Sequence, residues 1–274
     1  KDLINQSNLA AAQKIELNAQ NIDNQVGATI SSNETHIDAA DTLHNQGLIN
    51  GELTHIQANR VWNDGARIYG SHVAIQANTL DNKSNAAGIG AVIASRGDMD
   101  LGVETLNNQS GGAVKDNARD NAWIFSAGDL NVGGRLDTDL KAQGSANKIY
   151  NGSATIESLG NMYLGSKEIQ NVNENLKIDL IEKYRKNITA YGKDGQIWDS
   201  SIVRLTDSGD ASDAVLWVPE VEGGTPTKKI GEDWTRYIYT KVYSEQEVQT
   251  TSPAQIIAGG NLGFDNDATF LNKD

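Results

Sequence analysis

One stretch of the sequence predicts the fold: Val73-Ala74-Ile75-Gln76-Ala77-Asn78-Thr79-Leu80-Asp81-Asn82. Steps of two residues place Val73, Ile75 and Ala77 on one face of a strand, because alternate side chains of a strand share a face. The longer step to Leu80 indicates a corner. Asn82 tolerates the tight turn that follows.

The same frame recurs along the chain and ends at further asparagines. It fits the residues before Asn24 (Ile15, Leu17, Ala19, Ile22), Asn108 (Met99, Leu101, Val103, Leu106) and Asn171 (Met162, Leu164, Ser166, Ile169). The last three positions precede Asn63 (Ile56, Ala58, Val61), and a one-residue slip fits Asn45 (Ile37, Ala40, Leu43). Short strands and Gly-Asp or Gly-Asn turns lead into several frames, as in Val92–Asp98, Trp123–Asp129, Thr155–Asn161 and Ile256–Asn261.

A variable repeat of roughly 20 residues with strand periodicity is typical of a solenoid of stacked β-coils. Five coils are expected to end at Asn24, Asn45, Asn63, Asn82 and Asn108. Coil six is expected to run from Trp123 to Leu136, and coil seven from Ile149 to Asn171. Parallel stacking places like residues above like, so the asparagines are expected either to form turns or to build a ladder. The chain opens in the repeat register, which predicts a segment of a longer solenoid.

Residues 174–252 break the pattern and divide the chain into coils at 1–173, an insertion, and a last coil at 253–274. The insertion holds eight of the sixteen aromatic residues (5 Trp, 8 Tyr and 3 Phe). We expect a short helix over Leu176–Asn187, strands over Ser201–Leu205, Ala214–Val218 and Thr235–Val248, and a loop at Gly223–Pro226. Insertions in solenoids lie outside the stacked coils and often bind partners.

The candidate binding residues lie in this insertion. In Tyr237–Tyr243, alternation puts Tyr237, Tyr239, Lys241 and Tyr243 on one face and Ile238, Thr240 and Val242 on the other. The aliphatic face is expected to pack on the solenoid, and the tyrosine face suits recognition of proteins or sugars. Further candidates for receptor binding, or for a small core of the insertion itself, are Trp198, Trp217 and Trp234.

Composition excludes several classes of function. The formal net charge of −13 argues against general nucleic-acid binding and against an anionic membrane surface. The absence of Cys excludes disulfides and Cys-ligated metals. The sequence contains no run of about 20 apolar residues, so no membrane-spanning helix is predicted. We therefore expect a monomer that inserts into no membrane.

Residues that carry catalysis or bind metal are few. Two polar clusters, Asp116, Arg119 and Asp120, and Asp207, Asp210 and Asp213, are expected to be solvated loops rather than acid–base or calcium sites. The histidines, His36, His44, His55 and His72, lack the helical spacing of zinc ligands and are expected to face outward. We predict no catalytic residue, no metal site and no cofactor.

The rungs resemble the filamentous haemagglutinin repeats of exoproteins that Gram-negative bacteria export by two-partner secretion. The resemblance rests on Ile22–Gln25, Leu43–Gly47, Leu80–Asn82 and Gln255–Leu262, and covers nearly all of 1–171 and 253–274. It implies an all-β, right-handed parallel β-helix of about eight coils with one extra-helical insertion. It also implies export through an outer-membrane transporter to the cell surface.

Members of that family are adhesins, haemolysins, haem-scavenging proteins and toxin-delivery proteins of contact-dependent growth inhibition. The resemblance therefore implies a filament segment that binds a receptor on another cell. Within the family we favour growth inhibition, with an outer-membrane protein or lipopolysaccharide of a neighbouring bacterium as the receptor. The alternatives are a host-cell adhesin, a polysaccharide lyase or hydrolase on the same fold, and a stalk without binding activity.

Overall fold

The computed structural model describes residues 1–111, 121–206 and 214–273. The chain divides into two compact units. The solenoid unit comprises Lys1–Lys177 and Gln249–Asp274, and the insertion unit comprises Ile178–Val248. The boundaries lie slightly inside the 174–252 segment that the sequence marks as an insertion.

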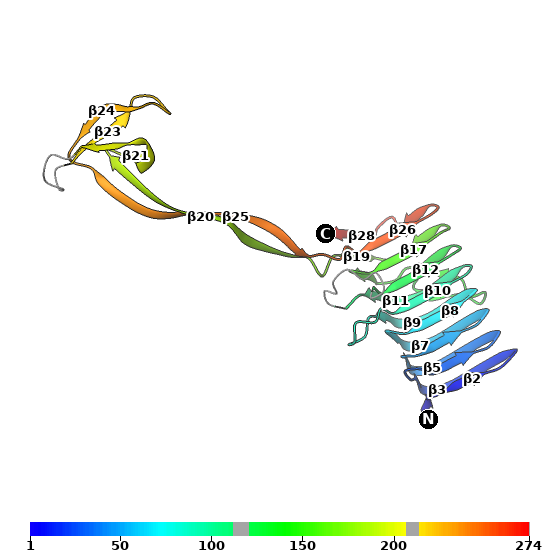
Figure 1. Cartoon of the computed structure of the whole chain (residues 1–274). Helices are drawn as coiled ribbons and strands as arrows, with labels where there is room; N and C mark the ends of the chain where they lie inside the picture. Colours follow the sequence, from blue (N-terminus) through cyan, green and yellow to red (C-terminus); the bar gives the residue numbers. More distant parts are fainter. Residues whose placement is uncertain (112–120, 207–213, 274) are drawn as a thin grey trace. The chain divides into compact units, whose positions relative to one another are not determined.

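The solenoid unit is a parallel β-helix, as the sequence predicts. Within the described residues, eight short strands pair in parallel to form one sheet (Figure 1). These strands are β2 (Asn8–Ala10), β4 (Thr29–Ser31), β6 (Leu48–Asn50), β8 (Arg67–Gly70), β10 (Val92–Ser95), β12 (Trp123–Ser126), β17 (Thr155–Ser158) and β26 (Gln255–Ala258). Each one opens a coil, so the prediction of about eight coils is confirmed.

A second parallel sheet contains the long strands that carry the repeat frame. After β1 (Leu3–Asn5), each long strand turns the corner of its coil: β3 (Lys14–Asn24), β5 (Glu34–Asn45), β7 (Leu53–Asp64), β9 (His72–Lys83) and β11 (Met99–Gln109). In the last three coils the two arms are separate strands. They are β13 (Leu130–Gly133) and β16 (Lys148–Gly152), β18 (Met162–Leu164) and β19 (Glu168–Val172), and β27 (Leu262–Phe264) and β28 (Thr269–Lys273).

The inward residues of the frame form one continuous apolar core. Ile56, Ile75 and Leu101 stack on successive coils and are fully buried. The position predicted for Ala40 is wrong, because Ala39 is the buried residue and pairs with Ala58. The register shift that follows Ala39 places the extra residue of this coil in a bulge on the outer side.

The frame asparagines form a buried ladder along the solenoid. From Asn5 to Asn171 the asparagines are buried, and Nδ2 of each donates to Oδ1 of the next one over 2.7 to 2.8 Å; the last one, Asn272, is exposed and accepts. Nδ2 also donates to backbone carbonyls of the adjoining coils; for example, Asn82 bonds to the carbonyls of Ala91 and Trp123. The ladder members are Asn5, Asn24, Asn45, Asn63, Asn82, Asn108, Asn151, Asn171 and Asn272. All amides point the same way, so each bond polarises the next one.

Coil six differs from its predicted course. Residues 134–146 leave the coil and form a hairpin from β14 (Arg135–Leu136) and β15 (Ala142–Gln143). The chain then returns as β16, which pairs with the asparagine arm of β11. The prediction that Ile149 begins coil seven is therefore wrong, since β16 closes coil six and Asn151 continues its ladder.

The insertion unit contains two small sheets. One has the strand order β21 (Gln196–Asp199), β20 (Lys177–Lys193) and β25 (Thr235–Thr250), and the other joins β22 (Arg204–Thr206), β23 (Val215–Pro219) and β24 (Pro226–Gly231). The predicted strand at Ser201–Leu205 is replaced by a 3₁₀ turn, Ser200–Ile202, followed by β22. Leu216, Val218 and Ala190 are buried in this unit.

The helix predicted over Leu176–Asn187 is wrong. All of these residues except Leu176 belong to β20, which pairs with β25, and no α-helix occurs in the described residues. Backbone pairing with a strand far along the chain outweighs the local helical pattern, as is common for short segments of mixed propensity.

Candidate functional site

Strands β20 and β25 form a two-stranded ribbon, and the contacts between them show that they run antiparallel. Lys183 forms an ion pair with Glu247, and Thr240 Oγ1 donates to Asn187 Oδ1 over 2.9 Å. Further along, the Tyr237 ring covers the backbone of Gly192, where a Cβ atom would lie 2.7 Å from a ring carbon. Only the end of β20 near Ala190 also pairs with β21.

The predicted tyrosine face lies on β25 and is exposed. Tyr239 is 48% exposed, and Tyr243 is 53% exposed with its hydroxyl donating to Glu245 over 2.8 Å. Lys241 is exposed as well. Since about half of each tyrosine remains accessible, these side chains form a surface that is available to a partner.

The aliphatic face of β25 is exposed in the structure. Ile238 is 70% exposed, and Val242 is also exposed. A ribbon of two strands has no third layer, so neither of its faces is covered in the way that a sheet in a sandwich is covered. The ribbon therefore presents apolar side chains on both faces, including Leu180 and Tyr184 of β20.

The three candidate tryptophans lie on other elements and are half-buried. Trp217 of β23 donates from Nε1 to Thr206 Oγ1 over 3.0 Å, and the Arg204 guanidinium lies 5.1 Å from its ring centroid. Trp234 donates to the Ala214 carbonyl over 2.7 Å and meets Tyr191 edge to face. These two indoles contribute to the core of the insertion unit. Trp198 lines a surface groove.

Trp198 reaches that groove because of a tight hairpin. Asp194 and Gly195, with φ of 54° and 80°, connect β20 to β21. Two successive positive φ values are the geometry of a type I′ turn, which Asp-Gly favours. The turn pairs Trp198 with Tyr191 across the hairpin.

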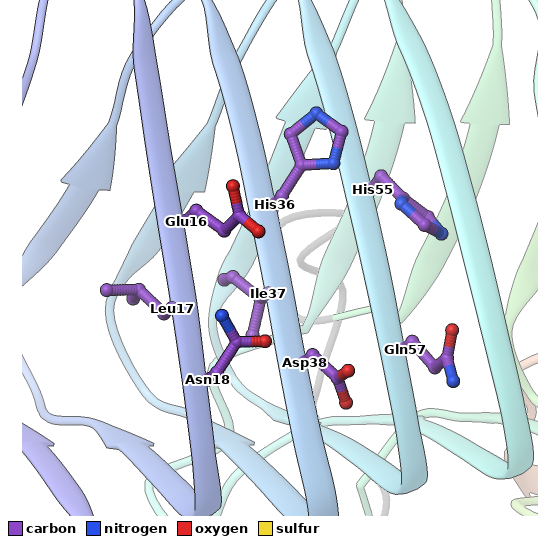
Figure 2. Close-up of a pocket in the computed structure, with 8 residues that line it drawn as sticks. All are labelled: Glu16, Leu17, Asn18, His36, Ile37, Asp38, His55 and Gln57. Atoms are coloured by element: carbon purple, nitrogen blue, oxygen red, sulfur yellow. The ribbon is translucent and has the colours of Figure 1, made fainter.

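A second polar groove lies on the outer face of the first coils of the solenoid unit. Figure 2 shows Glu16, His36 and His55 on adjacent strands, with Asn18, Asp38 and Gln57 beside them. Glu16, His36 and His55 are in register, and the two imidazole rings meet edge to face at 5.5 Å. The histidines face outward, as predicted, but their pairing is not apparent from the sequence.

Two side chains of this groove have shifted pKa values. The pKa of Glu16 is lowered, first by the hydrogen bond from Lys14, so this carboxylate is not held protonated as a general acid. Burial, and next the neighbouring His36, lower the pKa of His55. The groove has a volume of about 160 Å³, smaller than typical small-molecule sites.

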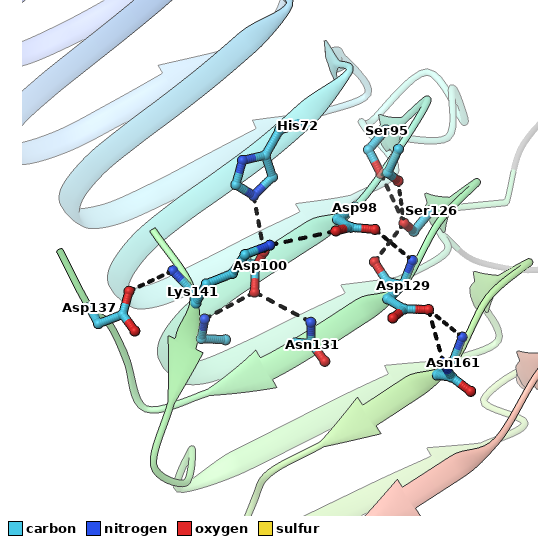
Figure 3. Close-up of polar contacts among 12 residues, drawn as sticks. His72, Ser95, Asp98, Asp100, Ser126, Asp129, Asn131, Asp137, Lys141 and Asn161 are labelled. Carbon is cyan, nitrogen blue, oxygen red and sulfur yellow. Dashed lines mark hydrogen bonds and ion pairs between the residues drawn. The ribbon is translucent and has the colours of Figure 1, made fainter. Parts of the chain in front are cut away.

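A third polar cluster surrounds the buried carboxylate of Asp100 on β11 (Figure 3). Oδ2 accepts from His72 Nε2 over 3.0 Å and from Lys141 Nζ over 3.1 Å, and Oδ1 accepts from the Ala142 amide over 3.0 Å. Although burial alone would raise the pKa of Asp100, these hydrogen bonds hold it below its usual value. The cluster fastens the hairpin of β14 and β15 to the sheet.

Glycines allow this hairpin to approach the sheet closely. A Cβ atom on Gly102 would lie 2.3 Å from the carbonyl carbon of Arg135, and one on Gly133 would lie 2.7 Å from the Gln143 carbonyl oxygen. Because the hairpin covers Asp100 and its hydrogen-bond donors, we assign this cluster a structural role.

Turn residues beside this cluster form a polar ladder on the corner of the coils. Asp98 Oδ1 accepts from the Asp129 amide over 3.0 Å, and Asp129 Oδ1 accepts from the Asn161 amide over 2.7 Å (Figure 3). These side chains bond to the backbone of the next coil, so they serve the fold.

The polar clusters predicted to be solvated loops, Asp116, Arg119 and Asp120, and Asp207, Asp210 and Asp213, lie outside the described residues. Within the described ranges, no group of three or more His, Cys, Asp or Glu side chains is arranged to hold a metal ion. The same residues contain no helix that is long and apolar enough to cross a membrane.

Comparison with known proteins adds no relative. No protein-family model, no curated protein and no solved structure matches this chain.

Proposed function

We propose that this chain is a non-catalytic segment of a cell-surface filament whose insertion unit binds a receptor on another cell. The receptor is an outer-membrane protein or lipopolysaccharide of a neighbouring bacterium, and the activity served is contact-dependent growth inhibition. The resemblance to filamentous haemagglutinin repeats supports export by a two-partner outer-membrane transporter and a place on the surface of a Gram-negative cell.

The observation that carries this proposal is the exposed ribbon of β20 and β25. Tyr239, Tyr243 and Ile238 are largely accessible, although each could have been replaced by a polar residue without loss of core. Large apolar patches on soluble domains usually mark interaction sites, and tyrosine is enriched in the centres of such sites. The solenoid unit has one continuous buried apolar core, although some of its large apolar side chains, such as Val26 and Leu159, are exposed as well.

A deletion tests the proposal, because the ends of the insertion unit lie close together. Asn173 Nδ2 donates to Thr251 Oγ1 over 2.8 Å, and Thr250 Oγ1 donates to the Asn175 carbonyl over 2.7 Å. Replacing 178–248 by a short Gly/Ser linker should therefore leave the solenoid unit folded, since each coil contacts mainly its neighbours. Circular dichroism and melting should show a β-rich solenoid, and pull-down from bacterial outer membranes should lose the receptor.

Substitutions within the ribbon test the predicted face itself. The triple variant Tyr237→Ala, Tyr239→Ala and Tyr243→Ala should weaken binding to bacterial cells without unfolding either unit. The control is Trp123→Ala, which removes an exposed aromatic side chain from β12 of the solenoid unit. Undiminished binding by the deletion variant would assign recognition to the coils. Binding to epithelial cells and not to bacteria would favour the host-cell adhesin.

A further inference from the structure

The groove beside Trp198 is a candidate ligand site within the insertion unit. It has a volume of about 410 Å³, within the range of about 300–1,000 Å³ that small-molecule sites occupy. Strand β21 supplies Gln196, Ile197 and Trp198, and the chain after β23 and strand β24 supply Glu220 and Lys228. Three strands of two different sheets thus converge on one hollow.

The polar side chains of this groove have no partner in the fold. Among the described residues, the side chains of Gln196, Glu220 and Lys228 make no hydrogen bond or ion pair. The outer face of the solenoid unit behaves differently, since Asp100 there has four hydrogen-bond donors. Ile197 is 60% exposed at the edge of the groove. An amide, a carboxylate and an ammonium group are therefore free to bind a ligand.

We propose that this groove binds a neutral saccharide of one or two rings. A sugar ring has C–H groups on its faces and hydroxyls at its edge. Trp198 lines the groove and can contact the C–H groups, while Gln196, Glu220 and Lys228 offer both donors and acceptors for the hydroxyls. Hydroxyl groups use both kinds of partner, which explains why the groove carries all three polar types.

The same composition argues against other ligands. The groove is lined mainly by polar groups, so it does not suit an acyl chain. The groove is lined by one carboxylate and one ammonium group, so it has no excess positive charge that would select a phosphate or a nucleic acid. A neutral saccharide can form hydrogen bonds with all three polar side chains, and it carries no charge that would require an excess of opposite charge in the groove.

This inference rests on the proposed function, because it identifies the chemistry of the receptor as the sugar portion of a cell-surface glycan. The two can be tested separately. Saccharide binding is measured with the purified chain and a free oligosaccharide, whereas receptor binding is measured with the chain and whole cells.

The test uses the complete 274-residue chain and a printed array of neutral bacterial and host oligosaccharides, followed by calorimetry with the strongest binder. Trp198→Ala should raise the Kd at least about tenfold. Glu220→Gln, which alters one exposed side chain and keeps its size, should also weaken binding. The controls are Trp123→Ala on β12 and Glu222→Gln, which changes an exposed carboxylate beside the groove that does not line it.

Each outcome decides between the two ideas. If no oligosaccharide binds, or if both groove variants bind as tightly as the parent, the saccharide site is refuted. Cell binding through the tyrosine face is then tested independently by the triple tyrosine variant. If an oligosaccharide binds and both groove variants lose it, the site stands even where no cell is bound. Bacterial oligosaccharides and host oligosaccharides on the array separate the two sources of the sugar.

Discussion

Asn82 and Ile238 illustrate how differently the two units treat their side chains. Asn82, a polar residue, is completely buried in the solenoid unit and bonds to Asn63, Asn108 and two carbonyl groups. Ile238, an aliphatic residue, is 70% exposed in the insertion unit. In the solenoid unit a polar group is buried because the stacking of coils satisfies it. In the insertion unit an apolar group is exposed, although its exposure adds nothing to the stability of the fold.

The largest expected effect breaks the ladder of the solenoid unit. Asn82→Asp replaces an amide donor with a carboxylate that faces Asn108 Oδ1 and two carbonyl oxygens, all of them acceptors. Burying this unpaired charge should cost about 3–5 kcal/mol of unfolding free energy. Thermal and urea unfolding followed by circular dichroism would measure the loss.

The matched control for this variant lies four residues earlier on the same strand. Asn78 is exposed, and its Nδ2 donates only to Asn59 Oδ1 over 2.6 Å. Asn78→Asp should therefore cost less than about 1 kcal/mol. Equal losses for Asn78→Asp and Asn82→Asp would mean that burial of the ladder is not what makes it important.

A smaller effect concerns the cluster around Asp100. Asp100→Asn keeps the size of the side chain and removes the charge that binds His72, Lys141 and the Ala142 amide. It should cost about 1–3 kcal/mol at neutral pH. The folded pKa of Asp100 is lowered, so its contribution is present above the unfolded value of about 3.9 and is lost as the pH falls through the folded value.

Melting temperatures between pH 6 and pH 3 would check both the size and the sign of this effect. The parent should lose stability towards pH 3 more steeply than Asp100→Asn does. Asp41→Asn is the control, because Asp41 is exposed and accepts only a 3.3 Å bond from Asn59. If Asp100→Asn became relatively less stable than the parent as the pH fell, the assigned direction of the pKa shift would be wrong.

The parts of the fold that the sequence predicts are those with local patterns. The residues inside one frame, such as Val73, Ile75 and Ala77, are close in sequence, and their alternation alone identifies an inward face. Stacking then follows from repetition, which also placed Asn82 above Asn63. Asn151 escaped prediction because the hairpin at 134–146 separates it from the frame that it completes.

The parts that the sequence did not predict depend on pairing over long distances. The strand β20 meets β25 more than fifty residues later, and Leu176–Asn187 carries no local sign of that partner. The groove likewise requires β21, β23 and β24 together. Trp198 was a candidate from its residue type alone, whereas Gln196, Glu220 and Lys228 became recognisable only when the structure showed them unpartnered around it.

The smallest expected effect on stability concerns Ile238, the exposed aliphatic residue of the insertion unit. Ile238→Ser removes an aliphatic side chain that contributes little buried area, so it should change stability by no more than about 0.5 kcal/mol. Ile75→Ser, in the core of the solenoid unit, should cost several kcal/mol, because it leaves a cavity and buries a hydroxyl group. Amide hydrogen exchange of peptides from β25 and β9 measures the two sites separately, since local unfolding of one strand does not require unfolding of the other. If Ile238→Ser accelerates exchange in β25 as strongly as Ile75→Ser does in β9, the aliphatic face of the ribbon is covered in solution. The exposed ribbon would then be part of a packed interface, and recognition of the receptor would have to be assigned to the groove or to the coils.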